Sequence, residues 1–175
     1  MSGCMSAFGG MGTIELCAGL KQLKEEHPPL LSQLDGLLST VVKIENEENI
    51  IESFKELTDR TRSFIADLGP HSDREEGVLF EMMGEYIGRH SGPIAVMEYE
   101  HDRAKTLIGT YLTRTAEESA EFSEAEIREL AAMIKEAYYT LTEHFAKEEN
   151  VLFPMAQRML SEEEKAELHR RIREI

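Results

Sequence analysis

One phrase occurs twice in this sequence, and it limits the possible folds more than any other feature. Residues 71–82 read HSDREEGVLFEM and residues 144–155 read HFAKEENVLFPM, and seven of the twelve positions are identical without a gap. At about 100° per residue, the histidine and the first glutamate of each copy lie on one stripe of a helix. Each copy is therefore predicted to be helical and to project an imidazole and a carboxylate, one turn apart, from an apolar face.

A weaker repeat lies upstream of each copy. A Glu-His pair ends at His27 and another at His101, and both have apolar residues at matching helical offsets before and after them. The separation from His27 to His71 is 44 residues, and that from His101 to His144 is 43. The chain is therefore predicted to contain two similar helical hairpins, each with the pattern His followed by His-x3-Glu.

Apolar residues recur at helical spacing through most of the chain, and no alternating strand pattern of useful length occurs. Turn and capping residues divide this pattern into four long elements, predicted at residues 13–44, 47–89, 93–118 and 124–159. Long helices with short connections predict an all-α fold, an antiparallel up-down four-helix bundle over residues 13–160. A short extra C-terminal helix is expected within residues 161–175. Residues 1–12, rich in Gly, Ser and Met, are expected to be a flexible segment.

Capping residues and prolines mark the helix boundaries. Ser123 and Ser161 are each followed three residues later by Glu, which is the spacing of a capping box at the start of a helix. Pro28, Pro29 and Pro70 lie inside the first two elements. Because a proline removes a backbone donor and crowds the preceding turn, these two helices are expected to be kinked or broken there.

The composition excludes several classes of function. A net charge of −15 argues against binding nucleic acid, and it disfavours docking on anionic membranes. No apolar run approaches the roughly 20 residues that span a bilayer, and no secretory signal precedes Lys21, the first basic residue. The two cysteines, Cys4 and Cys17, lie near the start and cannot form a disulfide framework, so the chain is expected to be cytoplasmic.

The positions of the four histidines along the hairpins predict that they meet at one level. At about 1.5 Å per residue, the mismatch within each hairpin is only one or two turns. Four imidazoles and two carboxylates in a bundle core describe a dinuclear metal site in which Glu75 and Glu148 bridge. Nitrogen and oxygen donors without thiolates favour iron, with manganese as a substitute, whereas structural zinc favours cysteine. The predicted ligands are His27, His71, Glu75, His101, His144 and Glu148.

Simpler interpretations are weaker. A ferritin-like centre needs two Glu-x-x-His pairs, and only Glu98-x-x-His101 fits. Ser72-x-x-Glu75 has the spacing of a capping box, but Glu148 in the second copy has no helix break to cap. The remaining expectations are that His90 and His169 are solvated, that Val78, Phe80, Val151 and Phe153 pack in the core, and that Cys17 is a small buried residue.

The chain resembles the hemerythrin-like, HHE cation-binding family over about residues 20–158. The resemblance rests on EEHPPL, HSDREEGVLF, GPIAVMEYEHD and HFAKEENVLFP, and the twice-stated H-x3-EE-x2-LF is specific. It implies a four-helix bundle that holds two iron ions with an oxo or hydroxo bridge, with manganese or zinc as possible substitutes. Carried over by motif, the ligands would be the same six residues.

The chain departs from part of that family. Oxygen-carrying hemerythrins have His-x3-His on the third helix, and here Met97 occupies the position of the extra histidine. The four-His, two-Glu pattern is closer to bacterial iron–sulfur-cluster repair proteins, which usually carry a separate N-terminal cysteine-bearing domain; the N-terminal segment here is expected to be too short for one. One metal would have an open or water-filled position unless Glu98, one turn before His101, fills it. Glu26 and Glu100 are candidates for contacts that tune the ligands.

Three functional hypotheses follow. The first is a non-haem di-iron protein that binds a small ligand, O2, NO or peroxide, for sensing, storage or stress response. The second is a redox role resembling that of an enzyme, such as reduction of NO or peroxide, or iron delivery for iron–sulfur-cluster repair. The third is an iron-responsive interaction module whose state depends on metal occupancy. Its protein partner is not specified by the sequence.

Overall fold

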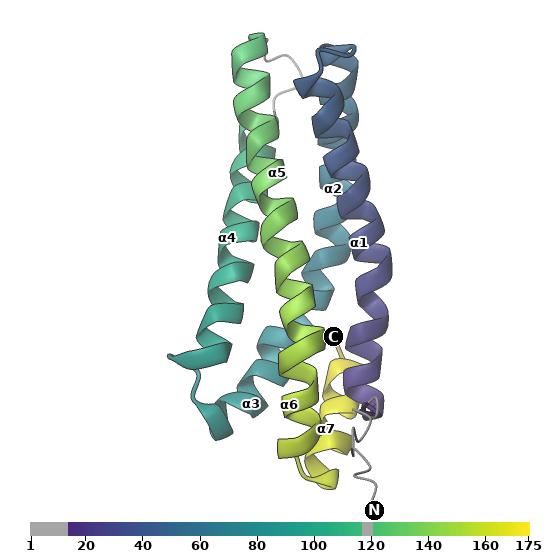
Figure 1. Ribbon diagram of the computed structural model, residues 1–175, viewed down its shortest axis with the longest axis vertical. Coiled ribbons are helices and arrows are strands. Elements are labelled where there is room, and N and C mark those ends of the chain that lie inside the picture. The colour runs from purple at the N-terminus through teal and green to yellow at the C-terminus, as the bar shows by residue number, and fades with distance from the viewer. Residues whose placement is uncertain (1–13, 117–120) are drawn as a thin grey trace, which may run out of the picture.

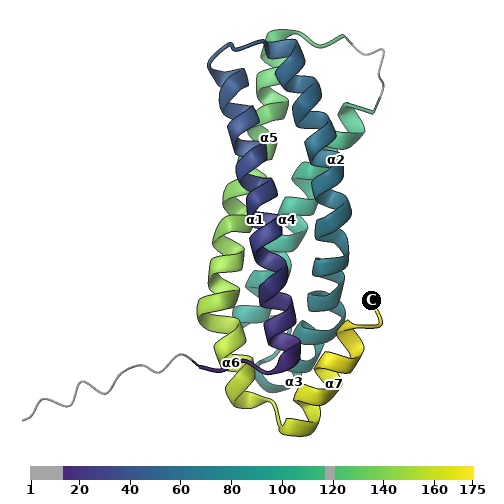
Figure 2. The ribbon, with the colours of Figure 1, turned by 90° about the vertical axis from the view of Figure 1, so that its right-hand side faces the viewer.

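The computed structural model describes residues 14–116 and 121–175, and it consists of four antiparallel helical arms with a short helix at one end (Figure 1). The first arm is α1 (Ala18–Glu45) and the third is α4 (Gly92–Arg114). The second arm contains α2 (Ile50–Arg74), the π-helical segment η1 (Glu75–Leu79) and α3 (Phe80–Ile87). The fourth contains α5 (Glu124–Lys147), the π-helical segment η2 (Glu148–Leu152) and α6 (Phe153–Met159). The closing helix α7 (Glu162–Ile172) lies beside the start of α1 (Figure 2).

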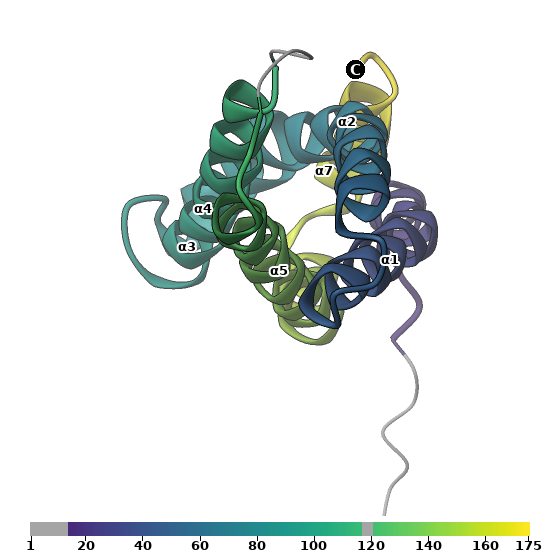
Figure 3. The ribbon, with the colours of Figure 1, turned by 90° about the horizontal axis from the view of Figure 1, so that it is seen from above.

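All regular structure in the described residues is helical, which confirms the all-α prediction. Seen from above, α1 lies beside α2 and α5, and α4 lies beside α5 (Figure 3). None of the described helices is long and apolar enough to cross a membrane. The predicted flexible segment, residues 1–12 with Cys4, lies outside the described residues, as do residues 117 and 118 of the third predicted helix.

Two helices begin with the predicted capping boxes. Glu126 N donates to Ser123 Oγ at 3.3 Å, and Ser123 N donates to the Glu126 carboxylate at 2.8 Å. Ser161 and Glu164 make the same reciprocal pair at the start of α7. Each pair satisfies backbone donors that the first helical turn leaves free, so both predicted N-caps are confirmed.

The prolines do not break the first two helices, so of the two expected effects, a kink or a break, the break is excluded. α1 continues through Pro28 and Pro29, and α2 continues through Pro70. All three prolines are exposed, so carbonyl groups that lose a helical partner face water. The opposite face of each helix is held by buried residues such as Leu30 and Leu68. Packing of that face therefore outweighs the local cost of the prolines.

The helical hydrogen-bond pattern changes instead inside the repeated phrase, where η1 begins at Glu75 and η2 begins at Glu148. A π turn holds one residue more than an α turn, so the following side chains are rotated from their α-helical positions. Val78 is 2% exposed and packs in a cluster with residues of α7, whereas Val151 is 49% exposed. The expectation that Val151 packs in the core is therefore wrong: α7 packs against η1, whereas Val151 of η2 is exposed.

Two apolar clusters fill the bundle. The cluster nearer the α1–α2 and α4–α5 connections includes Leu30, Leu68, Ala104, Ile134 and Phe145. The cluster at the α7 end includes Leu23, Val78, Met97, Leu152 and Leu168. Along each arm, the chain passes from one cluster to the other through a buried histidine. A polar layer therefore separates the two halves of the core.

Candidate metal centre

The six side chains predicted as ligands lie together in this polar layer. They form two groups, one of His27, His71, Glu75 and Glu148 and one of Glu75, His101, His144 and Glu148. Within each group the donor atoms lie within 4.8 Å of one another. All six residues are at most 1% exposed. Because both glutamates belong to both groups, the geometry could hold two metal ions that share two carboxylates.

Each shared carboxylate lies between imidazoles from different hairpins. The distances from Nε2 to carboxylate oxygen are 3.3 Å for His27–Glu148, 3.0 Å for His144–Glu148, and 3.4 Å for both His71–Glu75 and His101–Glu75. Each group therefore takes its two imidazoles from one hairpin and its carboxylates from both. The sequence could not specify which histidines share a group, since that depends on how the hairpins face each other.

The inward-facing donor atoms have no hydrogen-bond partner within residues 14–116 and 121–175. This holds for Nε2 of all four histidines and for both carboxylate oxygens of Glu75 and Glu148. Two buried carboxylates without hydrogen bonds are costly, and a multivalent cation bound by imidazole and carboxylate donors removes that cost. The donor set therefore fits a metal.

Four further glutamates contact the histidines at Nδ1, the ring nitrogen that faces away from the centre. Each accepts or shares a hydrogen bond with one Nδ1 atom, at 2.8 Å for Glu26–His71, 2.9 Å for Glu149–His27, 2.7 Å for Glu76–His101 and 3.1 Å for Glu100–His144. We call Glu26, Glu76, Glu100 and Glu149 the outer glutamates. A carboxylate at Nδ1 fixes the proton on that nitrogen and leaves Nε2 free to face the centre.

Sequence reasoning found two of the outer glutamates and missed two. Glu26 and Glu100 are candidates in the sequence because each precedes a predicted ligand. Glu76 and Glu149 lie about 140° around the helix from the histidine of their own phrase, and so are predicted to point away from it. They contact a histidine of the other hairpin instead. The repeated Glu-Glu doublet was the signal that could have identified them.

Each outer glutamate is also paired with a cation. The partners are Arg74 for Glu26 at 3.2 Å, Lys105 for Glu76 at 2.7 Å, Lys24 for Glu149 at 3.4 Å, and Lys147 for Glu100. The hydrogen bond with His101, together with Lys105, lowers the pKa of Glu76 to about 2. Four rows of imidazole, carboxylate and cation therefore run from the centre towards the surface.

The charges inside the centre are coupled. Burial alone lowers the pKa of a histidine, but Glu148 and Glu100 outweigh this at His144 and raise its pKa to about 10. Burial alone raises the pKa of a carboxyl group, but His144 and His27 outweigh it and lower the pKa of Glu148. The protonation of His144 is thus linked to the charge of Glu148, and a proton on the His144 imidazole must leave when a metal ion binds there.

Other residues singled out in the sequence lie outside the two groups. Ser72 lies within α2 and the Glu75 side chain belongs to the centre, which excludes a capping box between them. The Glu98 carboxylate accepts a hydrogen bond from Arg89 at 2.6 Å. Met97 is 4% exposed and packs in the cluster at the α7 end. The remaining candidates lie elsewhere: His90 is exposed, and His169 and Cys17 are half-buried.

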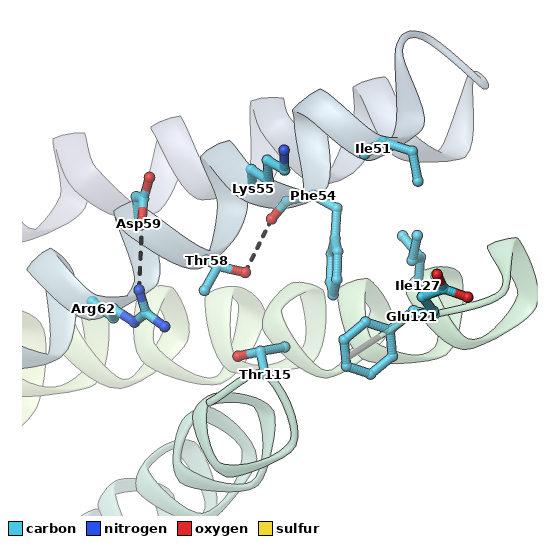
Figure 4. Close-up of a pocket in the computed structure, with 10 residues that line it drawn as sticks. Ile51, Phe54, Lys55, Thr58, Asp59, Arg62, Thr115, Glu121 and Ile127 are labelled. Carbon is cyan, nitrogen blue, oxygen red and sulfur yellow. Dashed lines mark hydrogen bonds and ion pairs between the residues drawn. The ribbon is translucent and has the colours of Figure 1, made fainter. Parts of the chain in front are cut away.

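A separate pocket of about 690 Å³ lies near the connections at the other end of the bundle (Figure 4). Its lining includes Phe54 and Thr115. The Thr58 hydroxyl donates to Phe54 O at 3.0 Å, and Asp59 pairs with Arg62 at 3.7 Å. Since these polar groups are already paired and no predicted ligand lines the pocket, it is not the candidate functional site.

The fold and the donor set define a class of protein, the metal-binding four-helix bundles with buried histidine and carboxylate donors. The family model that matches this chain is the Hemerythrin HHE cation binding domain, over residues 18–156. The chain therefore belongs to the hemerythrin HHE cation-binding family.

Several curated proteins are similar to part of the chain. The iron-sulfur cluster repair protein YtfE of Musicola paradisiaca is 39% identical over 96 residues, which are 54% of this chain and 43% of that protein. The proteins of the same name from Salmonella schwarzengrund and Salmonella typhimurium are 35% identical over 103 residues, 57% of this chain and 46% of theirs. The matches thus span less than half the length of these relatives. No solved structure matches the chain.

Proposed function

We propose that this protein binds two iron ions, one in each of the two groups. The observation that carries the proposal is the set of buried donor atoms that have no hydrogen-bond partner in residues 14–116 and 121–175. Imidazole and carboxylate donors without thiolates favour iron, and manganese or zinc are possible substitutes. The oxo or hydroxo bridge implied by the family resemblance is part of the same proposal.

The surrounding residues would hold and tune the ions. The outer glutamates keep the Nδ1 protons in place, so all four Nε2 atoms are directed inward. The apolar clusters on either side exclude bulk water from the polar layer. Bound iron would supply ligand binding and redox chemistry that these side chains lack.

We propose further that the centre binds a small ligand, O2, NO or peroxide, for sensing, storage or stress response. Within the part of the chain that the structure describes, each group offers donors from four residues, two histidines and two glutamates. Glu98 is held by Arg89 and does not add a fifth. An ion with open positions can accept an external ligand.

The alternative is a redox or repair role, namely reduction of NO or peroxide, or delivery of iron to iron–sulfur clusters. It is favoured by the relatives named as iron–sulfur cluster repair proteins. This chain spans less than half their length, so their activity comes to it only as a proposal.

Metal analysis of protein purified from iron-replete cells tests the first proposal. We expect two iron ions per chain, in keeping with the two donor groups. The variant His101→Ala with His144→Ala should lose at least half of the iron, whereas the control His90→Ala with His169→Ala should keep it. Less than one metal per chain, unchanged by the first pair of substitutions, would contradict the proposal.

Optical spectra of the reduced protein separate the functions. A stable, reversible adduct with oxygen or nitric oxide would favour ligand binding. Rapid oxidation with repeated consumption of peroxide or nitric oxide would favour the redox role. Transfer of iron to a cluster-free acceptor protein would favour repair.

A further inference from the structure

Ser72 carries a buried hydroxyl group that has no hydrogen-bond partner among the described residues. Several other hydroxyl groups on these helices donate to the carbonyl four residues earlier, as Thr40 does to Gly36 O at 3.0 Å and Thr61 to Leu57 O at 2.7 Å. The Thr142 hydroxyl, however, like that of Ser72, has no partner among the described residues. A buried hydroxyl without a partner is costly, and such a group in a native fold calls for an explanation. Its neighbour in sequence is His71, one of the proposed ligands.

The repeated phrase shows what stands at this position in the other hairpin. Ser72 follows His71 as Phe145 follows His144. The Phe145 ring stacks on His27, with 4.4 Å between ring centroids and an angle of 23° between planes. Phe153 also stacks on His27, at 5.6 Å and 23°. Two phenyl rings therefore pack against the imidazole of His27.

The His101 imidazole of the second hairpin has an equivalent stacking partner. Phe80 stacks on His101 at 5.6 Å and 30°, as Phe153 does on His27. Both phenylalanines are fully buried, as predicted. The two halves of the centre thus follow one approximate two-fold relation, in which Ser72 corresponds to Phe145 and His101 corresponds to His27. Ser72 therefore supplies a small hydroxyl side chain where the other half of the centre has a second phenyl ring.

At a second pair of equivalent positions, the residue that follows His101 is again smaller than the one that follows His27. Leu30 follows His27 by three residues, and Ala104 follows His101 by three residues. Both are buried. Under the two-fold relation, both side chains on the His101 side, Ser72 and Ala104, are therefore smaller than their counterparts on the His27 side.

We propose that these two smaller side chains, Ser72 and Ala104, leave a space beside His101 that admits the small ligand to the ion held by His101 and His144, and that the Ser72 hydroxyl donates a hydrogen bond to that ligand. Phe145 and Leu30 fill the equivalent space beside His27. The ligand has two or three atoms, with an outer atom that accepts a hydrogen bond. Ser72 is a positioning residue, and its role rests on the function proposed above.

Azide binding to the iron-loaded full-length chain tests this proposal, with optical titration for affinity and the infrared stretch of azide as a probe of hydrogen bonding. Ser72→Ala should keep two irons, lower the azide affinity about five-fold and shift the azide stretch, because one hydrogen bond is lost. Ser72→Thr, which keeps a hydroxyl, should restore the shift. Ala104→Leu should keep the iron and weaken azide binding by more than about ten-fold through loss of space.

Failure of this inference is distinct from failure of the proposed function. Wild-type protein without bound metal would contradict the di-iron proposal itself. Two bound irons with no azide adduct would overturn the ligand space. Ser72→Ala and Ala104→Leu variants that keep both irons and bind azide as the wild type does would overturn it as well.

Discussion

The outer glutamates determine how the histidine rings are presented. Each Nδ1 atom is held by a carboxylate, and each carboxylate is held by a lysine or an arginine. A histidine with a carboxylate at one nitrogen is a stronger donor at the other. The same row of charges keeps the imidazoles oriented when no metal is present, because the outer pairs do not depend on the ion.

Glu100→Gln tests this orientation. The amide keeps the shape of the side chain but loses the charge that His144 and Lys147 share. We expect metal affinity to fall by about 10- to 100-fold. Competition with a chelator measures it. Glu98→Gln, two residues away on the same helix and paired only with Arg89 among the described residues, is the control and should bind metal as the wild type does. Equal affinities for all three proteins would contradict the role of Glu100.

Glu76 should make metal-free protein sensitive to acid. Hydrogen bonds with His101 and Lys105 lower its pKa from 4.5 to about 2. A carboxylate with a lowered pKa contributes stability above its unfolded value, so this contribution is present above pH 4.5 and is lost as the pH falls towards 2. The free energy of unfolding of Glu76→Gln should fall less steeply over that range. Chemical denaturation after chelation measures both slopes, and parallel slopes would refute the prediction.

At the scale of residues, the sequence was most informative about side chains whose position is set by the face of a single helix. The paired spacings placed six side chains on inward stripes, and the structure brings all six together; their role as ligands stays a prediction. Glu76 and Glu149 could not be found in this way, because their partners lie on another hairpin. Contacts between helices depend on how each helix is rotated about its axis and shifted along it relative to its neighbours. The residue pattern of one helix does not contain that information.

Among the elements, the two π-helical segments η1 and η2 are the main difference between the predicted and the observed helices. Proline positions in the sequence predicted kinks or breaks, yet the helices continue through the prolines and the hydrogen-bond pattern changes at Glu75 and Glu148. In η1, carbonyl groups are reached by arginines from other elements: Arg89 donates to Glu76 O at 3.4 Å and Arg171 to Gly77 O at 3.0 Å. Such long-range partners cannot be read from a local pattern, and they help to explain why a wide turn is tolerated.

Helix α7 depends on a close approach at Gly19. A Cβ atom there would lie 2.9 Å from Leu168 Cγ and 3.1 Å from His169 N. Gly19→Leu should therefore displace α7, uncover Val78 and destabilise the fold by about 1–3 kcal/mol. Trypsin should then cleave faster at the arginines of α7, which mass spectrometry detects.

The matched control is Gly109→Leu on α4, where an added Cβ would meet no described atom within 4 Å. This variant should keep both its stability and its resistance to trypsin in α7. If Gly19→Leu and Gly109→Leu were cleaved at the same rate, the close approach would not hold α7 in place.

For the whole molecule, the polar layer divides one bundle into two apolar clusters. Helical periodicity and short connections were sufficient to predict the bundle, because few other arrangements bury four long amphipathic helices. They did not predict which hairpin α7 covers. Both hairpins carry the same phrase. The position of α7 against the first hairpin depends on the close approach at Gly19 and on the hydrogen bond from Arg171 to a carbonyl group of η1.

Removal of metal should loosen the two clusters unequally. The cluster at the α7 end includes the short helices α3, α6 and α7, while the other cluster is spanned by four long helices. Without an ion across the polar layer, we expect faster amide hydrogen exchange in α3, α6 and α7 and little change near the α1–α2 connection. Exchange measured by mass spectrometry with and without chelator checks this, and a uniform change along the chain would contradict it.

The arrangement of the shared carboxylates has a consequence for assembly. Glu148 stands between His27 and His144, and Glu75 between His71 and His101, so every carboxylate joins one hairpin to the other. A cut in the connection between α3 and α4 would leave two fragments, each with two imidazoles and one carboxylate. Neither fragment could reproduce the centre, whereas the two mixed together could. Under the proposed function, metal retention would then act as a complementation signal, reporting that both halves are present and correctly paired.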